Sequence, residues 1–256
     1  MDLSMIHRTI LFSAFFVLFY NTNCYSQERV ITPLNEHFFA VNEGSDDHHY
    51  NKIESTSKTG ESIEKIYNLE NKLIAFKKAR TADSLGTRIF IEVEQKFSLT
   101  GKLEQSRLKY SNSDSTRIFV IVEEEIILDL HCQTKDKCEG IYIQTTGEEE
   151  FVDRNIFHPS FTSYKLWEKF LLNNLTYPLV ARIGGHQGKV FVGIKIDHTG
   201  ELSEIKFMNS HETHSSLKKE VERILRKYKG GFIPARSIDG QYISAWMYFP
   251  VKFSLG

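Results

Sequence analysis

The sequence is poor in the residues that build spacers, and it lacks an excess of either charge. It contains 5 prolines and 15 glycines among 256 residues, too few for a long proline-rich spacer or a low-complexity tail. Lys and Arg number 32 against 33 Asp and Glu, which gives a formal net charge of −1. Proteins that bind nucleic acid usually carry a basic field, so this balance argues against such a partner.

Long apolar runs are also scarce, and the clearest one lies near the N-terminus. Residues 10–20 read ILFSAFFVLFY, and this run is shorter than the roughly 20 residues that cross a bilayer. Arg8 precedes it, and small residues precede a cleavage point after Ser26. We therefore predict a signal peptide over residues 1–26 and export to the periplasm. An uncleaved membrane anchor is the alternative.

Cysteine is rare as well, and its placement indicates a disulfide. Of the 3 cysteines, Cys24 falls in the predicted signal peptide, which leaves Cys132 and Cys138. Compartments outside the inner membrane are oxidising, so we expect these two residues to be bonded. A free or metal-bound pair is the alternative, but no third cysteine supports a metal site.

Motifs that would carry catalysis or bind a metal are weak throughout the chain. The candidates are HETH at 211–214, the pair His48 and His49, the glycine-rich GGHQG at 184–188, and the glutamate runs at 123–125 and 148–150. None has the residue spacing of a zinc helix or of a phosphate loop. Consecutive glutamates on a strand point to opposite faces and converge poorly on calcium. We expect no enzyme, no cofactor, no metal and no small-molecule substrate.

The region from residue 27 to residue 157 alternates strand-like and turn-like segments. Segments such as Thr87–Phe97 alternate apolar and polar residues, which predicts half-buried strands. A weak echo recurs at a spacing of 30 residues, beginning at Tyr67 and at Phe97. Two explanations of this echo remain open: repeated hairpins, or a chance similarity within an antiparallel meander. Either way, the region is predicted to be rich in β-hairpins.

From residue 158 to residue 256 the pattern mixes helices and strands, so the predicted fold class is α+β. Apolar residues at helical spacing precede Pro178, which ends that helix. The hairpin at 188–207 alternates strictly, and an amphipathic helix follows at 215–228. A long strand covers 242–255, and Pro250 places it at a sheet edge because proline cannot donate to a ladder.

Four segments in this order resemble the C-terminal domain of TonB-family proteins. They read LTYPLVAR, GGHQGKVFVGIKIDHTGEL, GGFIPARSIDGQYI and WMYFPVKFSL. The matching positions are Tyr177, Pro178, Gly188, Val190, Asp197, Gly200, Phe232, Pro234, Pro250 and Phe253. At Phe232 the family usually has tryptophan. More loosely, the N-terminal half is similar to hairpin-repeat modules attached to TonB-like domains in Bacteroidetes-type proteins.

The resemblance implies two helices on a three-stranded antiparallel sheet, and a domain that does no bond chemistry. It implies that the last strand recruits an extended segment of an outer-membrane transporter, or of another envelope protein, by strand addition. The expected peptide-binding residues are Tyr242, Ser244, Trp246, Tyr248 and Lys252. Trp246 and Tyr248 would form an aromatic platform for the peptide; packing beneath a helix is the alternative.

Departures from the family leave two other functions open. The usual family member has a membrane anchor and a long proline-rich spacer, and this sequence is predicted to lack both. If residues 10–20 remain as an anchor, the protein would instead be a full energy transducer for outer-membrane transport. A third hypothesis is a structural envelope module that forms a homodimer through its last strand.

Overall fold

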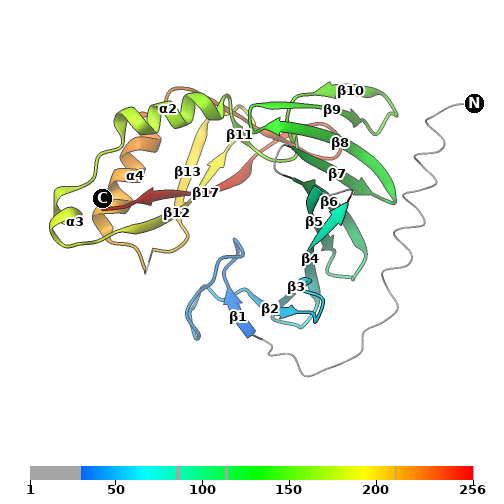
Figure 1. Ribbon diagram of the computed structural model, residues 1–256, viewed down its shortest axis with the longest axis horizontal. Helices are drawn as coiled ribbons and strands as arrows, with labels where there is room; N and C mark the ends of the chain where they lie inside the picture. Colours follow the sequence, from blue (N-terminus) through cyan, green and yellow to red (C-terminus); the bar gives the residue numbers. More distant parts are fainter. Residues whose placement is uncertain (1–29, 85–86, 113–114, 211, 256) are drawn as a thin grey trace, which may run out of the picture.

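The computed structural model describes residues 30–84, 87–112, 115–210 and 212–255. The predicted signal peptide lies outside these residues. The first ten strands form one antiparallel meander in which each strand pairs with the next along the chain. They are β1 Val30–Leu34, β2 Tyr50–Thr56, β3 Ser62–Asn68, β4 Leu73–Ser84, β5 Thr87–Phe97, β6 Leu103–Ser111, β7 Thr116–Val122, β8 Glu125–Thr134, β9 Lys137–Ile143 and β10 Glu149–Val152. Figure 1 shows this sheet as an arc that carries β1 back toward the C-terminal strands.

One turn conformation recurs along the chain and explains the echo in the sequence. In each case the first residue's N–H donates to the fifth residue's carbonyl, and the fourth residue's N–H donates to the first residue's carbonyl. The turns cover residues 57–61, 68–72, 98–102, 144–148, 197–201 and 237–241. The fourth residue always has a positive φ, a conformation that suits glycine and asparagine. The segments that begin at Tyr67 and Phe97 therefore echo each other because they build the same hairpin turn.

The end of the meander has the largest apolar core of this sheet. Its buried residues are Val120, Leu128, Leu130, Tyr142, Val152 and Ile156. The Tyr142 hydroxyl donates to the carbonyl of Ile238 at 2.7 Å, and Arg236 pairs with Glu150 at 2.8 Å. These contacts attach the small hairpin of β15 (Ala235–Arg236) and β16 (Tyr242–Ile243) to the meander.

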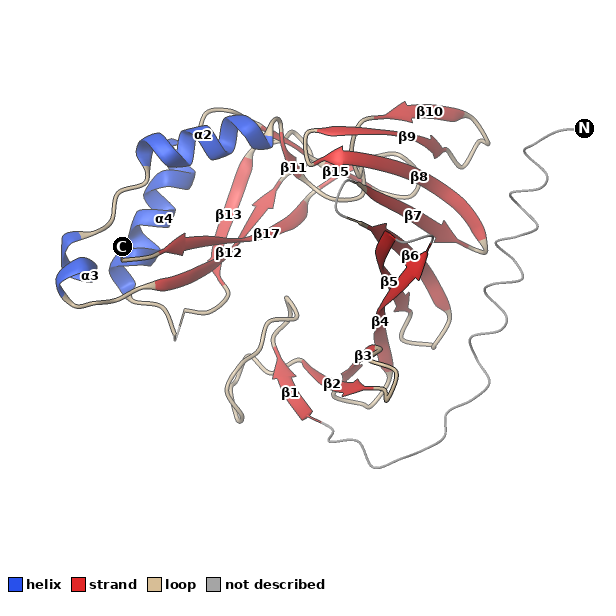
Figure 2. Cartoon of the chain, in the orientation of Figure 1, coloured by secondary structure: helices blue, strands red, loops and turns tan. Residues whose placement is uncertain are grey.

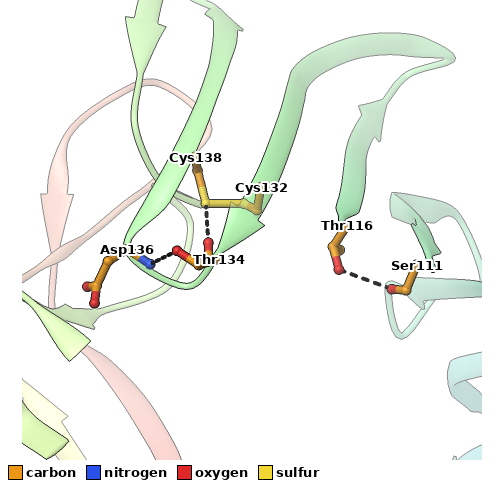
Figure 3. Close-up of a disulfide and its surroundings, with 6 residues drawn as sticks. All are labelled: Ser111, Thr116, Cys132, Thr134, Asp136 and Cys138. Atoms are coloured by element: carbon orange, nitrogen blue, oxygen red, sulfur yellow. Dashed lines mark hydrogen bonds between the residues drawn. A yellow bond between two sulfur atoms is a disulfide. The ribbon is translucent and has the colours of Figure 1, made fainter. Parts of the chain in front are cut away.

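A disulfide stabilises the β8–β9 hairpin, whose tip contacts the first helix. Cys132 and Cys138 lie opposite each other in the register of β8 and β9 and are bonded (Figure 3). At the tip between them, the Asp136 carboxylate accepts the N–H groups of Tyr164 at 2.6 Å and Lys165 at 2.8 Å. A carboxylate at a helix N-terminus accepts hydrogen bonds from amides that have no partner within the helix. Its negative charge also interacts favourably with the positive end of the helix dipole. The tip of this hairpin thereby fixes the start of the C-terminal region.

The C-terminal region packs its helices on one face of a three-stranded sheet (Figure 2). The elements are β11 Ser160–Phe161, α2 Tyr164–Asn174, α3 Leu179–Ile183, β12 Gly188–Ile196, β13 Leu202–Phe207, α4 Ser215–Lys227, β14 Phe232–Ile233 and β17 Ala245–Phe253. The core residues that join sheet and helices are Trp167, Val190, Val192, Ile194, Ile196, Leu217, Val221, Ile224, Leu225 and Val251. Within the described residues, no helix is long and apolar enough to cross a membrane.

Two details differ from the elements expected from the sequence. A third helix, α3, follows α2, because the φ of −61° at Pro178 suits the residue that precedes a helix. The expected strand at 242–255 is divided at Ser244 into β16 and β17. Residues 242–243 pair with β15 rather than with β12, so the last long strand begins at Ala245.

A buried glutamate connects α4 to the end of α2. The carboxylate of Glu220, 8% exposed, accepts the N–H of Thr176 at 2.7 Å and two guanidinium donors of Arg223. Arg223 also donates to the carbonyl of Asn174, which would otherwise lack a helical partner. Burial alone would raise the pKa of Glu220, but the hydrogen bonds from Arg223 and Thr176 outweigh it and lower the pKa.

We expect Glu220→Ala to lower the free energy of unfolding by about 2 kcal/mol, because it removes charge-assisted hydrogen bonds and leaves the Thr176 amide unpaired. Glu222→Ala is the matched control. Glu222 also pairs with an arginine on α4, but it is 41% exposed and should cost less than about 0.5 kcal/mol. Urea unfolding of both variants measures the difference, and equal losses would contradict the assigned role of Glu220.

Candidate functional site

Strand β17 lies at the edge of the three-stranded sheet. The order of strands is β13-β12-β17, and among the described residues β17 pairs with β12 alone. The pairing is antiparallel and has no bulge from Gly188 opposite Phe253 to Ile196 opposite Ala245. An edge strand presents unpaired backbone groups, which are a template for another strand.

The hydrogen bonds of β12 show which backbone groups of β17 are free. The N–H of Phe191 donates to Asn209 Oδ1 at 2.9 Å, and its carbonyl accepts the N–H of Met208 at 2.9 Å. Both groups therefore point toward β13, away from Pro250, which lies opposite Phe191 in β17. Because backbone direction alternates along a strand, residues 246, 248, 250 and 252 direct their backbone groups to the open edge. Pro250 offers a carbonyl there but no N–H.

The same alternation separates the two faces of the sheet. Val190, Val192, Ile194 and Ile196 are each 0% exposed and face the helices. Trp246, Tyr248 and Lys252 therefore lie on the opposite face, since each is out of phase with the buried Val251 and Phe253. We call Trp246, Tyr248 and Phe191 the aromatic face.

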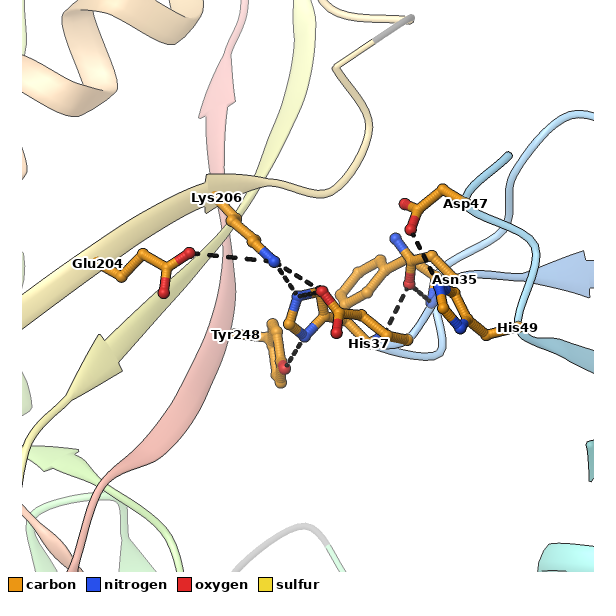
Figure 4. A network of polar contacts seen from close by, with 9 residues as sticks. Asn35, His37, Asp47, His49, Glu204, Lys206 and Tyr248 are labelled. Atoms are coloured by element: carbon orange, nitrogen blue, oxygen red, sulfur yellow. Dashed lines mark hydrogen bonds and ion pairs between the residues drawn. The ribbon is translucent and has the colours of Figure 1, made fainter. Parts of the chain in front are cut away.

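A loop from the N-terminal end of the meander packs on this aromatic face. We call residues 35–41, which follow β1, the covering loop. The ring of Phe39 lies 5.4 Å from Tyr248 and 6.2 Å from Phe191 between centroids. The ring of His37 meets Trp246 edge-on at 4.7 Å, and Figure 4 shows it between Tyr248 and Lys206. The covering loop, and not a helix, therefore packs against Trp246 and Tyr248.

Glycine at position 193 makes room for this contact. Gly193 lies opposite both Tyr248 in β17 and Lys206 in β13. A Cβ atom there would lie 2.9 Å from Cε1 of Tyr248 and 2.8 Å from Cε of Met208. The missing side chain leaves a notch over β12, into which Tyr248 leans. His37 contacts both residues that flank this notch.

Charged groups surround the covering loop at this contact. Lys206 Nζ lies 2.7 Å from Glu36 Oε1 and 3.2 Å from His37 Nε2. The hydrogen bond from Lys206 lowers the pKa of Glu36, and the same bond raises the pKa of Lys206. Burial, with Glu36 nearby, raises the pKa of Tyr248 to about 12. The phenol therefore stays neutral and donates or accepts a hydrogen bond at every physiological pH.

Asn35 holds the covering loop in its bent shape. Its side-chain oxygen accepts the N–H groups of His37 at 2.9 Å and Phe39 at 3.0 Å. Phe38, between them, has a φ of 63° and turns its ring toward Tyr50 on the meander. Neighbouring aromatic side chains thus point to different parts of the molecule, Phe38 to the meander and Phe39 to the C-terminal sheet.

The other expected peptide-binding residues lie away from the edge of β17. Tyr242 is on β16, where its ring lies 5.2 Å from the guanidinium of Arg236. Ser244 occupies the break between β16 and β17. Of the five residues expected to bind the peptide, the structure thus brings Trp246, Tyr248 and Lys252 together on one strand.

The residues of the family motif lie mostly at structural positions. Tyr177 donates its hydroxyl to the carbonyl of His186 at 2.7 Å, and Asp197 accepts the amides of Thr199 and Glu201 in its turn. The remaining motif positions are Pro178 before α3, Gly188 and Val190 in β12, Gly200 in the turn, Phe232 and Pro234 around β14, and Pro250 and Phe253 in β17. Phe232 packs 5.4 Å from Phe161 in the core.

The histidine motifs show no clustering typical of a metal centre. His211 lies outside the described residues, and His214 stacks on His186 at 4.0 Å and accepts the N–H of Ser216 at the start of α4. His48 contacts Asn51, and His49 contacts Asp47. Across the part of the chain that the structure describes, no three His, Cys, Asp or Glu residues are grouped to hold a metal ion.

Sequence reasoning missed the covering loop altogether. His37 and Tyr248 are separated by 211 residues, and no periodic pattern relates positions that far apart. The available signal was composition, since the pair Phe38 and Phe39 is an aromatic cluster within an otherwise polar stretch. Such a cluster outside a strand indicates a contact, but not its location.

The comparisons with known proteins concern the C-terminal region. Residues 173–255 match the family model of the Gram-negative bacterial TonB protein C-terminal domain. No curated protein and no solved structure matches the chain. The matched residues include α3, β12, β13, α4 and β17, so a TonB C-terminal domain carries both the open edge and the aromatic face.

We expect Gly193→Val to displace Tyr248 and loosen the covering loop, because its side chain would fill the notch over β12. The free energy of unfolding should fall by about 1–2 kcal/mol, as for other overpacked sites. Hydrogen exchange of residues 35–41 and urea unfolding report the two effects. Lys195→Val is the control, because it places the same side chain on the same strand and face. Equal protection of the loop in both variants would refute the notch.

Proposed function

We propose that the TonB C-terminal domain of this protein binds an extended peptide segment of an outer-membrane transporter as a further strand beside β17. The family match indicates a TonB-like, envelope-associated protein involved in envelope transport. The proposal of strand addition rests on the open edge of β17. The backbone groups of Trp246, Tyr248 and Lys252 at this edge have no partner strand among the described residues.

Strand addition suits this edge for physical reasons. Backbone hydrogen bonds supply affinity for a peptide of almost any sequence, and neighbouring side chains set the register and the specificity. Pro250 interrupts the row of donors, which limits pairing with unrelated strands. A partner strand would therefore pair with backbone groups on both sides of Pro250, and its side chains would alternate between the helical face and the aromatic face.

In this proposal the protein is a periplasmic binding module and does no bond chemistry. Recognition by backbone pairing needs no cofactor, nucleic acid or small-molecule substrate. The same edge could instead pair with β17 of a second copy, since the two-fold pairing of identical edge strands is antiparallel. That homodimer is the competing outcome in the experiment below.

We expect Lys252→Pro to weaken peptide capture about tenfold, because it removes an N–H from the open edge while leaving the pairing with β12 intact. Lys252→Ala is the matched control. It removes the charged side chain but keeps the backbone donor. If the peptide bound only through the charge of Lys252, both variants would lose affinity equally.

The measurement has two stages. The protein captures transporters from outer-membrane extract, and synthetic peptides from the periplasmic N-terminal segments of the recovered transporters are then titrated by calorimetry. Equal affinities for Lys252→Pro and Lys252→Ala would reject strand addition at this edge. Light scattering that shows a dimer in the wild type and a monomer in Lys252→Pro would assign the edge to self-association.

A further inference from the structure

We propose that the covering loop is a pH-sensitive latch, which closes the N-terminal end of the meander onto the aromatic face through neutral His37 and opens when that ring gains a proton. The latch joins β1 to β17 across nearly the full length of the described chain. It concerns the shape of the protein itself and does not depend on whether β17 binds a peptide.

Few side chains of the covering loop reach the C-terminal sheet. The side chains that bridge it are those of Glu36, His37 and Phe39. Beyond them lies a cavity of about 440 Å³, lined on one side by Asn35, residues 41–45 and Asp47 and on the other by Phe207, Met208 and Ser210. The covering loop therefore contacts the C-terminal sheet at one narrow place.

Lys206 and Tyr248 together suit one neutral tautomer of His37 in the closed form. Nε2 lies 3.2 Å from the ammonium of Lys206, which has donors but no acceptor, so a hydrogen bond between them requires a lone pair on Nε2. The proton then resides on Nδ1 and is donated to the hydroxyl oxygen of Tyr248 at 2.9 Å. Both ring nitrogens are thus used, and the ring is neutral.

A second proton, on Nε2, would face the Lys206 ammonium at 3.2 Å in a side chain that is only 9% exposed. It would place an N–H against the Lys206 ammonium and add a positive charge beside it. The carboxylate of Glu36 lies 3.2 Å from Nε2 and could accept that hydrogen bond, but the same oxygen also binds Lys206 at 2.7 Å, so protonation would set two cations against one carboxylate. The other charged groups that face the ring are Glu204, which is 4.0 Å from Lys206, and Asp47, which pairs with His49.

These groups together set the direction of the pH dependence. Burial, followed by the charge of Lys206, lowers the pKa of His37 despite Glu36, Asp47 and Glu204. With the loop released, the ring should titrate near its ordinary value of about 6.5. The closed form therefore binds fewer protons than the open form, so closure is most favoured above about pH 6.5 and weakens as the pH falls.

Hydrogen exchange of residues 35–41 tests the latch directly on the full chain without any added partner. Between pH 7.5 and pH 5.5 we expect their protection factors, corrected for intrinsic exchange, to fall by up to about tenfold. His37→Gln keeps groups that hydrogen-bond to Lys206 and Tyr248 but cannot gain a proton, so its protection should not vary with pH. His49→Gln is the matched control and should retain the wild-type change.

Tryptophan fluorescence gives a second, independent readout. The chain has two tryptophans, and Trp167 is 5% exposed in the helical core, whereas Trp246 contacts His37. The emission should change over the same pH range in the wild type and in His49→Gln, and this change should be absent from Trp246→Phe and from His37→Gln. Constant loop protection in the wild type, or an unaltered pH dependence in His37→Gln, would overturn the latch.

Discussion

The strict alternation of β12 determines the rest of the C-terminal region. Four aliphatic side chains from Val190 to Ile196 are fully buried against the helices, and burying each of them contributes about 1.5–3 kcal/mol. Because a strand cannot slip by one residue without exposing this whole set, the register with β17 is fixed. That register in turn decides which side chains form the aromatic face and which backbone groups of β17 remain open.

The open edge and the covering loop therefore follow from the same constraint. If β12 buries its even-numbered residues, Gly193 must lie on the other face, where its missing side chain admits Tyr248. Phe191 must then direct its backbone groups to β13, which leaves the groups of Tyr248 and Lys252 at the edge. The open edge of β17 and the notch over β12 thus lie on neighbouring strands, and residues that face away from the helical core form the notch.

Local patterns predicted the parts of this arrangement that depend on neighbouring residues. The period of two indicated the hairpin at 188–207, helical spacing indicated α4, and Pro250 indicated that the last strand lies at an edge. Contacts between distant segments carry no such pattern. The capping of α2 by Asp136 and the docking of His37 both join polar residues from irregular turns, which sequence periodicity cannot place.

Within the described residues, the meander contacts the C-terminal region at both of its ends, and these connections differ in how they respond to solution conditions. The hairpin of β15 and β16 is attached through the Tyr142–Ile238 hydrogen bond and the Arg236–Glu150 ion pair, and Asp136 binds the free amides at the start of α2. Both connections lie close to the point where the two regions join along the chain. The covering loop lies at the opposite end of the meander and depends on a histidine. The arc is therefore attached at one end by contacts that involve no histidine, whereas at the other end its closure varies with the protonation of one imidazole.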